Sequence, residues 1–200
     1  RLEDGMPNLY AYLGTGNFHE DTAKIYSDFG IFTNDKRITA EVARVFTYLE
    51  TKHRHNVHFQ YLGVGLFNLK EKFISLIKRE IEFAKKGKKA KMILKMNSLQ
   101  DEEMINLLYD ASKAGVRIKL LIRGICCLVP GQKNLSENIE AYSIVDRYLE
   151  HSRVFVFHNN GENEVYLSSA DWMVRNLHFR VETLFPIFDH DIAKEIITLM

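Results

Sequence analysis

Tyr166-Leu167-Ser168-Ser169-Ala170-Asp171 is echoed earlier in the chain by Tyr12-Leu13-Gly14-Thr15-Gly16-Asn17. In each copy, a tyrosine and a leucine typical of a strand end are followed by small and hydroxyl residues and then by an acid or an amide. Small residues allow backbone N–H groups to approach a phosphate closely. The repeat therefore predicts two β–α units that face each other across one anion, although six residues can also match by coincidence.

Hydrophobic periodicity extends outward from these turns as alternating helices and strands. Apolar residues at three- and four-residue steps predict helices over residues 39–52, 68–86, 101–114 and 190–200. Short apolar runs predict strands over residues 9–13, 92–96, 118–122, 154–157, 165–167 and 181–188. This alternation is typical of an α/β fold in which helices flank a mixed sheet. The sequence has three prolines and no Gly- or Ser-rich linker, which indicates one domain.

Composition is that of an ordinary globular protein. The 200 residues are 46% hydrophobic and 26% charged, enough to bury a core. Lys and Arg total 27 against 26 Asp and Glu, so the net charge of +1 gives no overall reason to expect nucleic acid or an anionic membrane as a partner. Any anion site must be local. The two cysteines are adjacent and predict no disulfide framework, which favours a reducing cytosol, and no apolar run approaches the ~20 residues that span a bilayer.

A histidine and a basic residue precede the second turn. His151-Ser152-Arg153 places the imidazole 15 residues before Tyr166. This order resembles the phospholipase D superfamily, in which each of two halves supplies a histidine, a basic residue two positions later and a Gly/Ser-rich turn. The resemblance implies a phospholipase D-like mixed sheet flanked by helices. We expect the equivalent histidine of the first half to precede Arg1, in a larger protein of which this sequence is a part.

Longer stretches narrow the resemblance to one family. They are Leu13–His19, Lys24–Gly30, Lys95–Leu99, Ile122–Gly131, Leu135–Ile139, Tyr148–Arg153 and Leu167–Met173. Together they resemble bacterial-type polyphosphate kinases along essentially the whole chain, and such long stretches are more specific than a lone Gly-rich motif. The resemblance implies an enzyme that reversibly transfers the terminal phosphate of ATP to inorganic polyphosphate through a phosphohistidine.

The resemblance also implies a domain organisation and a set of partners. Residues 1–55 would be the end of a first phospholipase D-like domain (C1), and residues 56–200 a nearly complete second one (C2). The phosphorylated histidine and the ligands of Mg²⁺ would lie upstream, with no metal ligand in this part, so this part alone is expected to be inactive. ATP or ADP and polyphosphate would be the substrates, with no nucleic acid. The family resemblance further implies a cytoplasmic homo-oligomer that can associate with the inner face of the membrane.

Three residues match phosphate-site positions of the family, namely Tyr26, Arg123 and His151. Phosphoryl transfer needs mainly positioning and cations around oxygens that share negative charge. Arg123 ends an apolar strand and would present a planar fork to two phosphate oxygens, unless it forms a structural ion pair. His151 is the candidate catalytic residue, because an imidazole exchanges protons near neutral pH. Tyr26 would donate its hydroxyl, although a tyrosine between apolar residues often only packs.

Three further residues are candidates for supporting roles. Arg153 stands where phospholipase D relatives usually have lysine, so it either contacts phosphate or forms an ion pair between strands. Asn17 and Asp171 close the two turns and either orient catalytic groups or make Asx turns. Two other function classes stay open: a phosphodiesterase of the phospholipase D class, which would need no ATP, and a non-catalytic binding module.

Overall fold

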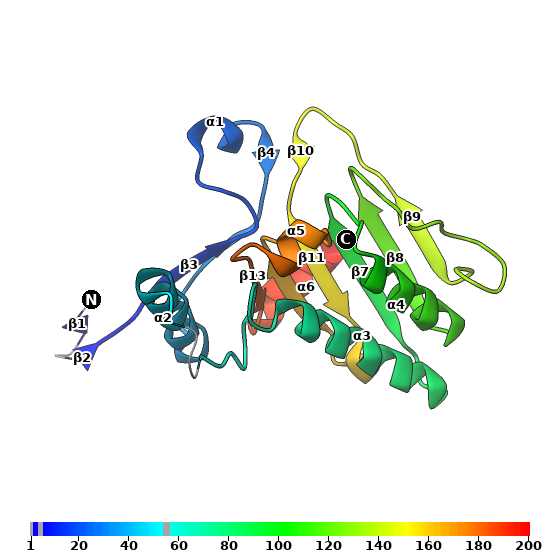
Figure 1. Cartoon of the computed structure of the whole chain (residues 1–200), viewed down its shortest axis with the longest axis horizontal. Helices are drawn as coiled ribbons and strands as arrows, with labels where there is room; N and C mark the ends of the chain where they lie inside the picture. The colour runs from blue at the N-terminus through cyan, green and yellow to red at the C-terminus, as the bar shows by residue number, and fades with distance from the viewer. Residues whose placement is uncertain (1, 4–5, 54–56) are drawn as a thin grey trace.

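A seven-stranded mixed sheet forms the centre of the molecule in the computed structural model, which describes residues 2–3, 6–53 and 57–200 (Figure 1). Its strands run, from one edge to the other, β6 (Gly63–Val64), β13 (Thr183–Pro186), β12 (Glu164–Ser168), β11 (Arg153–Phe157), β7 (Lys91–Met96), β8 (Arg117–Ile122) and β9 (Ile139–Tyr142). The last three are mutually parallel and the other pairings are antiparallel. Parallel pairing requires a crossover, which a helix between β7 and β8 supplies.

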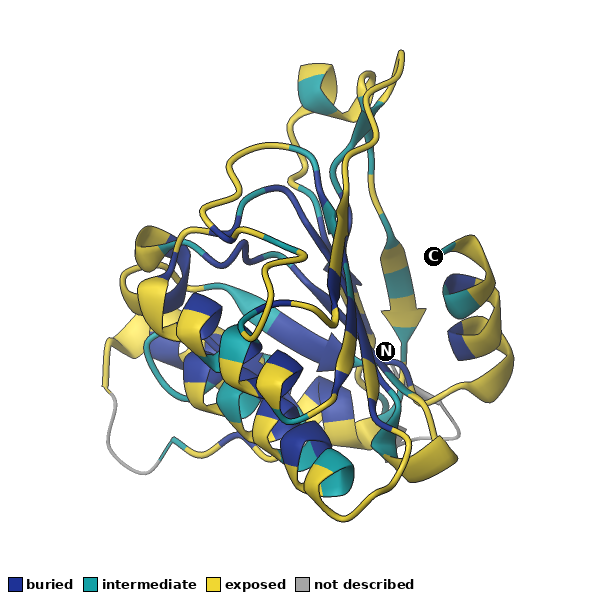
Figure 2. Ribbon diagram, turned by 90° about the vertical axis from the view of Figure 1, so that its right-hand side faces the viewer, coloured by how far each residue is buried: buried dark blue, intermediate teal, exposed yellow. Residues whose placement is uncertain are grey.

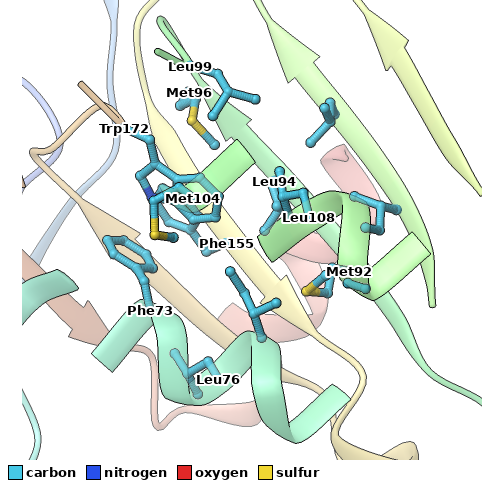
Figure 3. Close-up of a cluster of buried hydrophobic side chains, with 14 of the residues drawn as sticks. Phe73, Leu76, Met92, Leu94, Met96, Leu99, Met104, Leu108, Phe155 and Trp172 are labelled. Atoms are coloured by element: carbon cyan, nitrogen blue, oxygen red, sulfur yellow. The ribbon is translucent and has the colours of Figure 1, made fainter. Parts of the chain in front are cut away.

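Two helices cover one face of the sheet. They are α3 (Leu69–Lys85) and α4 (Glu102–Lys113), and their buried sides turn toward the strands (Figure 2). Trp172 lies fully buried against the rings of Phe73 and Phe155, with ring centroids 5.2 and 5.6 Å away (Figure 3). Met92 and Leu94 of β7 join the same cluster. This packing fixes the strand ends from which the candidate site residues emerge.

The opposite face of the sheet is covered by a second apolar cluster. Ile93, Val154 and Leu167 contribute from the strands, and Ile196 contributes from α6 (His190–Leu199). The N-terminal part of the chain adds apolar residues to this cluster, among them Ile38 of α2 (Lys36–Thr51). Every residue of β11 is buried, as expected for a central strand with both faces covered.

The N-terminal segment brings a second set of residues to the end of the sheet. β3 (Ala11–Gly14) pairs antiparallel with β5 (Gly30–Thr33), and the excursion between them contains α1 (Glu20–Ala23) and β4 (Tyr26–Ser27). β4 pairs in parallel with β10 (Leu149–Glu150), which directly precedes His151. The remaining elements are β1 (Leu2–Glu3), β2 (Met6–Pro7), the 3₁₀ turn η1 (Asn159–Gly161) and α5 (Val174–His178).

The α/β fold class predicted from the sequence, a mixed sheet flanked by helices, is confirmed. The expected helices and longer strands are present within a few residues of their predicted bounds, except that β13 is limited to Thr183–Pro186. The predicted boundary at 55/56 falls on residues 54–56, outside the described part of the chain. Among the described helices, none combines the length and the apolar character needed to span a bilayer.

Candidate active site

His151 lies beside an acidic residue that is distant in sequence. Its Nδ1 is 3.0 and 2.9 Å from the two carboxylate oxygens of Asp28. A carboxylate only accepts hydrogen bonds, so Nδ1 carries the proton, and the acceptor nitrogen Nε2 lies 3.1 Å from Arg153 Nη1. The ring of Tyr26 lies 4.6 Å from the imidazole, centroid to centroid. The His151 side chain is 13% exposed, so the imidazole is held in place and still accessible.

Asp28 is kept ionised by its neighbours. Burial alone would raise the pKa of this carboxyl, but hydrogen bonds from His151 and Thr15 and the charge of Arg153 outweigh burial, so the pKa lies below its ordinary value. The hydroxyl of Thr15 donates to Asp28 Oδ1 at 2.7 Å. An ionised carboxylate on one ring nitrogen fixes the tautomer and the orientation of an imidazole, as in catalytic triads.

Arg153 joins the two turns of the sequence repeat. Its Nε and Nη2 donate to the two oxygens of Asp171 at 3.2 and 3.0 Å, and its Nη1 donates to the carbonyl of Thr15 at 2.8 Å. The two side chains are only 8% and 9% exposed. Burial alone would raise the pKa of Asp171, but the guanidinium and the backbone N–H groups of Asn97 and Ser98 lower it below its ordinary value. The two turns therefore converge, as the repeat predicts.

Arg123 is the cation of the site that has no carboxylate partner in the described part of the chain. Its Nε donates to Asn97 Oδ1 at 3.0 Å, and its two terminal nitrogens form no hydrogen bond or ion pair with any residue that the structure describes. Lys95 and Arg153, by contrast, are each paired with an acid. The same Asn97 amide donates to the carbonyl of His151 at 3.2 Å, so one side chain holds both groups. Arg123 can thus offer a planar fork to an anion near His151.

The structure brings five of the six predicted site residues into one cluster. Tyr26, Arg123, His151, Arg153 and Asp171 are linked directly or through one intervening side chain. Asn17 instead makes a local Asx turn, in which its Oδ1 accepts from the N–H of His19 at 3.1 Å. In the first turn, the buried residue that meets Arg153 and Asp28 is Thr15, which is 1% exposed.

Asp28, Asn97 and Lys95 were missed by the sequence reasoning. All three lie inside stretches that carry the family resemblance. A signal was therefore present, but the partners of Asp28 and Asn97 are 123 and 54 residues away along the chain, and hydrophobic periodicity says nothing about such pairs. The two-residue strands β4 and β10 that join these segments are too short for an alternation pattern.

Comparison with known proteins identifies the family. Residues 62–200 match the family described as "Polyphosphate kinase C-terminal domain 2", and residues 1–55 match "Polyphosphate kinase C-terminal domain 1". The chain belongs to the polyphosphate kinase family. It is 49% identical over 200 residues to a polyphosphate kinase of Vibrio vulnificus (strain YJ016), and 45% identical over 196 residues to one of Bacillus anthracis. In both comparisons the match extends over at least 98% of this chain and over 28% of the relative.

Solved structures agree with this assignment. The polyphosphate kinase of Porphyromonas gingivalis superposes with a TM-score of 0.92 and 48% identity, over 99% of this chain and 30% of that one. NucT from Helicobacter pylori is only 12% identical, with a TM-score of 0.51 over 69% of this chain and 90% of that one, and shows the fold alone. The phospholipase D-like fold predicted for the chain is confirmed. The chain spans less than a third of the length of the polyphosphate kinases that it matches.

Polyphosphate kinases raise the question of a magnesium site. In the part of the chain that the structure describes, no group of three or more His, Cys, Asp or Glu side chains is placed to hold a metal ion. The acids of the site are already paired, namely Asp28 with His151, Glu150 with Lys95 and Asp171 with Arg153. These residues do not fit a magnesium site.

Proposed function

We propose that the full-length protein reversibly transfers the terminal phosphate of ATP to inorganic polyphosphate through a phosphohistidine. The observation that carries this proposal is the fork of Arg123, which has no partner for its terminal nitrogens among the described residues and is linked through the Asn97 amide to the backbone carbonyl of His151. Membership of the polyphosphate kinase family supports the choice of reaction. A planar cation that has no acidic partner suits the shared negative charge of a phosphoryl group in transfer.

Each site residue has a distinct task in this proposal. Arg123 binds two oxygens of the phosphoryl group, and Tyr26, whose hydroxyl has no hydrogen-bond partner among the described residues, donates a third hydrogen bond. Nε2 of His151, which lies 3.1 Å from Arg153 Nη1, would itself carry a proton when the imidazole acts as an acid, and would then protonate the leaving oxygen or stabilise its charge. Asp28 fixes the imidazole, and Arg153, held by Asp171, supports the site and does not bind phosphate.

The proposal also includes the phosphorylated histidine, the ligands of Mg²⁺, the domain organisation and the assembly of the whole enzyme. The histidine that accepts the phosphate would lie upstream of Arg1, as would the ligands of Mg²⁺. Residues 1–55 would then complete the first domain (C1) and residues 56–200 would form the second (C2). The whole enzyme would be a cytoplasmic homo-oligomer that can associate with the inner membrane face. These proposals rest on the family and on the length of its members.

The test is incorporation of labelled phosphate from ATP into polyphosphate by the full-length protein. We expect His151→Ala to lower the rate about 10²- to 10⁴-fold, because the loss of a positioned acid–base group has this effect. Exposed His190 at the start of α6 offers a matched control, and His190→Ala should leave the rate unchanged. Undiminished synthesis by the His151→Ala variant would remove His151 from the mechanism.

The same preparations separate the phosphodiesterase alternative. A phosphodiesterase would hydrolyse bis(p-nitrophenyl) phosphate without ATP, and this hydrolysis would be lost in His151→Ala. We expect no such hydrolysis from the full-length protein. ATP-independent cleavage in the absence of polyphosphate synthesis would overturn the proposed reaction.

A further inference from the structure

Lys95 reaches both residues that flank His151. Its Nζ lies 3.1 Å from Glu150 Oε2, 3.1 Å from the carbonyl oxygen of Ser152 and 2.5 Å from Ser152 Oγ. Lys95 is the next-to-last residue of β7, and the His151 segment enters β11, the neighbouring strand in the sheet. One ammonium group therefore ties down the chain immediately before and immediately after the imidazole.

The contacts of Lys95 leave it no capacity to bind substrate. An ammonium has three N–H donors and no acceptor, and here all three donors have acceptors within hydrogen-bond distance. The side chain is 6% exposed. Burial lowers the pKa of Lys95, and the carboxylate of Glu150 offsets only part of this effect. A charged lysine in so buried a position depends on its partners, because an unpaired buried charge is costly.

The residue that follows β7 makes a second contact with the segment 150–152. Two residues beyond Lys95, the amide of Asn97 donates to the carbonyl of His151 at 3.2 Å. Residues 150, 151 and 152 are thus each held by Lys95 or Asn97, and the carbonyl of Ser27 accepts hydrogen bonds from the N–H groups of His151 and Ser152. The position of the imidazole relative to Asp28 and Arg123 follows from these attachments.

We propose that Lys95 is a positioning residue for phosphoryl transfer, which acts by fixing Glu150 and Ser152 and thereby the direction of the His151 imidazole. The inference rests on the proposed role of His151. An ordinary buried ion pair would contribute to stability alone. A positioning residue also sets the turnover rate in molecules that are fully folded, because misplacing a catalytic group by about 1 Å can cost ~10²-fold in rate.

The test uses Lys95→Met in the full-length protein, with kcat and KM for ATP measured beside the equilibrium affinity for ATP. We expect kcat to fall about 10- to 100-fold while ATP affinity changes less than about threefold, because Arg123 and Tyr26 keep their positions. Lys95→Arg retains a cation with several donors and should recover part of the lost rate. The matched control is Lys91→Met, since Lys91 is an exposed lysine on the same strand and the same side of the sheet.

The outcomes separate this inference from the proposed function. If His151→Ala abolishes synthesis while folded Lys95→Met turns over at the normal rate, Lys95 is structural only and the inference is wrong. If His151→Ala is fully active, the proposed role of His151 fails first and the inference fails with it, while the proposed reaction still stands. Should Lys95→Met not fold, Glu150→Gln and Ser152→Ala each remove one attachment at milder cost. A normal kcat in both of these folded variants overturns the inference, and a lowered kcat with normal ATP affinity supports it.

Discussion

Replacing Arg153 by methionine should destabilise the chain strongly, and a second substitution at Asp171 should restore part of the loss. Arg153→Met removes three hydrogen bonds that lie between 2.8 and 3.2 Å, two to the carboxylate of Asp171 and one to the carbonyl of Thr15. It leaves a carboxylate whose side chain is 9% exposed without its cation. Removing one partner of such a buried pair costs about 3–5 kcal/mol.

The double variant measures the interaction itself. Asp171→Asn alone leaves the guanidinium without its carboxylate, whereas Arg153→Met with Asp171→Asn removes both charges. The asparagine oxygen can still accept from the backbone N–H of Asn97, a bond of 2.7 Å in the structure. We therefore expect the double variant to be more stable than the sum of the single effects by about 2–3 kcal/mol, at the upper end of coupling energies between residues in contact.

Urea unfolding followed by the fluorescence of Trp172 is a suitable assay, because Trp172 is the single tryptophan and follows Asp171 directly. The ion pair between Lys85 and Glu82, whose side chains are 60% and 57% exposed, provides a control double-mutant cycle. Its coupling should be about 0.5 kcal/mol or less. If the two substitutions at Arg153 and Asp171 add to within ~0.5 kcal/mol, they do not interact and the bridge between the two turns is refuted.

Three further outcomes are expected from the same structure. The pKa of Asp171 is lower in the folded state than its unfolded value of about 3.9, so its ionised carboxylate stabilises the fold fully above that pH. This stabilisation is lost as the pH falls through the folded-state pKa. The urea midpoint should therefore drop in acid, and it should drop less in Asp171→Asn. In Gly124→Ala the new Cβ would lie 2.9 Å from the carbonyl oxygen of Asn97. This clash should lower the free energy of unfolding by about 1–3 kcal/mol and weaken ATP binding by displacing the adjacent Arg123. An unchanged urea midpoint together with an unchanged ATP affinity would contradict this prediction. The indole N–H of Trp172 is buried without a hydrogen-bond partner among the described residues, so Trp172→Phe should cost under about 1.5 kcal/mol and Trp172→Ala about 3–5 kcal/mol when unfolding is followed by circular dichroism.

Patterns that extend over a whole element were sufficient to predict most of the fold. α3 is one example, since Leu69, Phe73, Leu76 and Ile77 recur at helical spacing and all four are buried against the sheet. The short pair β4 and β10 could not be found in this way, because two residues show no period. Their pairing follows from long-range contacts, and it is this pairing that carries Asp28 to the imidazole.

The repeat that pointed to the site was correct for the convergence of the turns and did not resolve the roles within them. By position, Asn17 corresponds to Asp171, yet Asn17 is exposed and Asp171 is buried beside Arg153. The reason is the strand that each turn follows. β12 is an inner strand of the large sheet, so the turn after it is buried, whereas β3 belongs to a two-stranded ribbon whose turn leaves only Thr15 inside. The two turns are similar in sequence, but their residues differ in burial and therefore in their contacts.

In the proposed anion site of this chain, whose net charge is +1, Arg123 is the cation that has no acidic partner among the described residues. Glu150 neutralises Lys95 and Asp171 neutralises Arg153. The two cations also donate hydrogen bonds to backbone carbonyls, Lys95 to that of Ser152 and Arg153 to that of Thr15. Among residues that the structure describes, the Arg123 side chain is hydrogen-bonded only to the neutral amide of Asn97, which orients the guanidinium without cancelling its charge. Since an ion-paired arginine would have to lose its acid before it could bind phosphate, the missing acid matters as much as the arginine itself. At the proposed site, recognition of a phosphate would depend on this local imbalance and would need no broad basic surface.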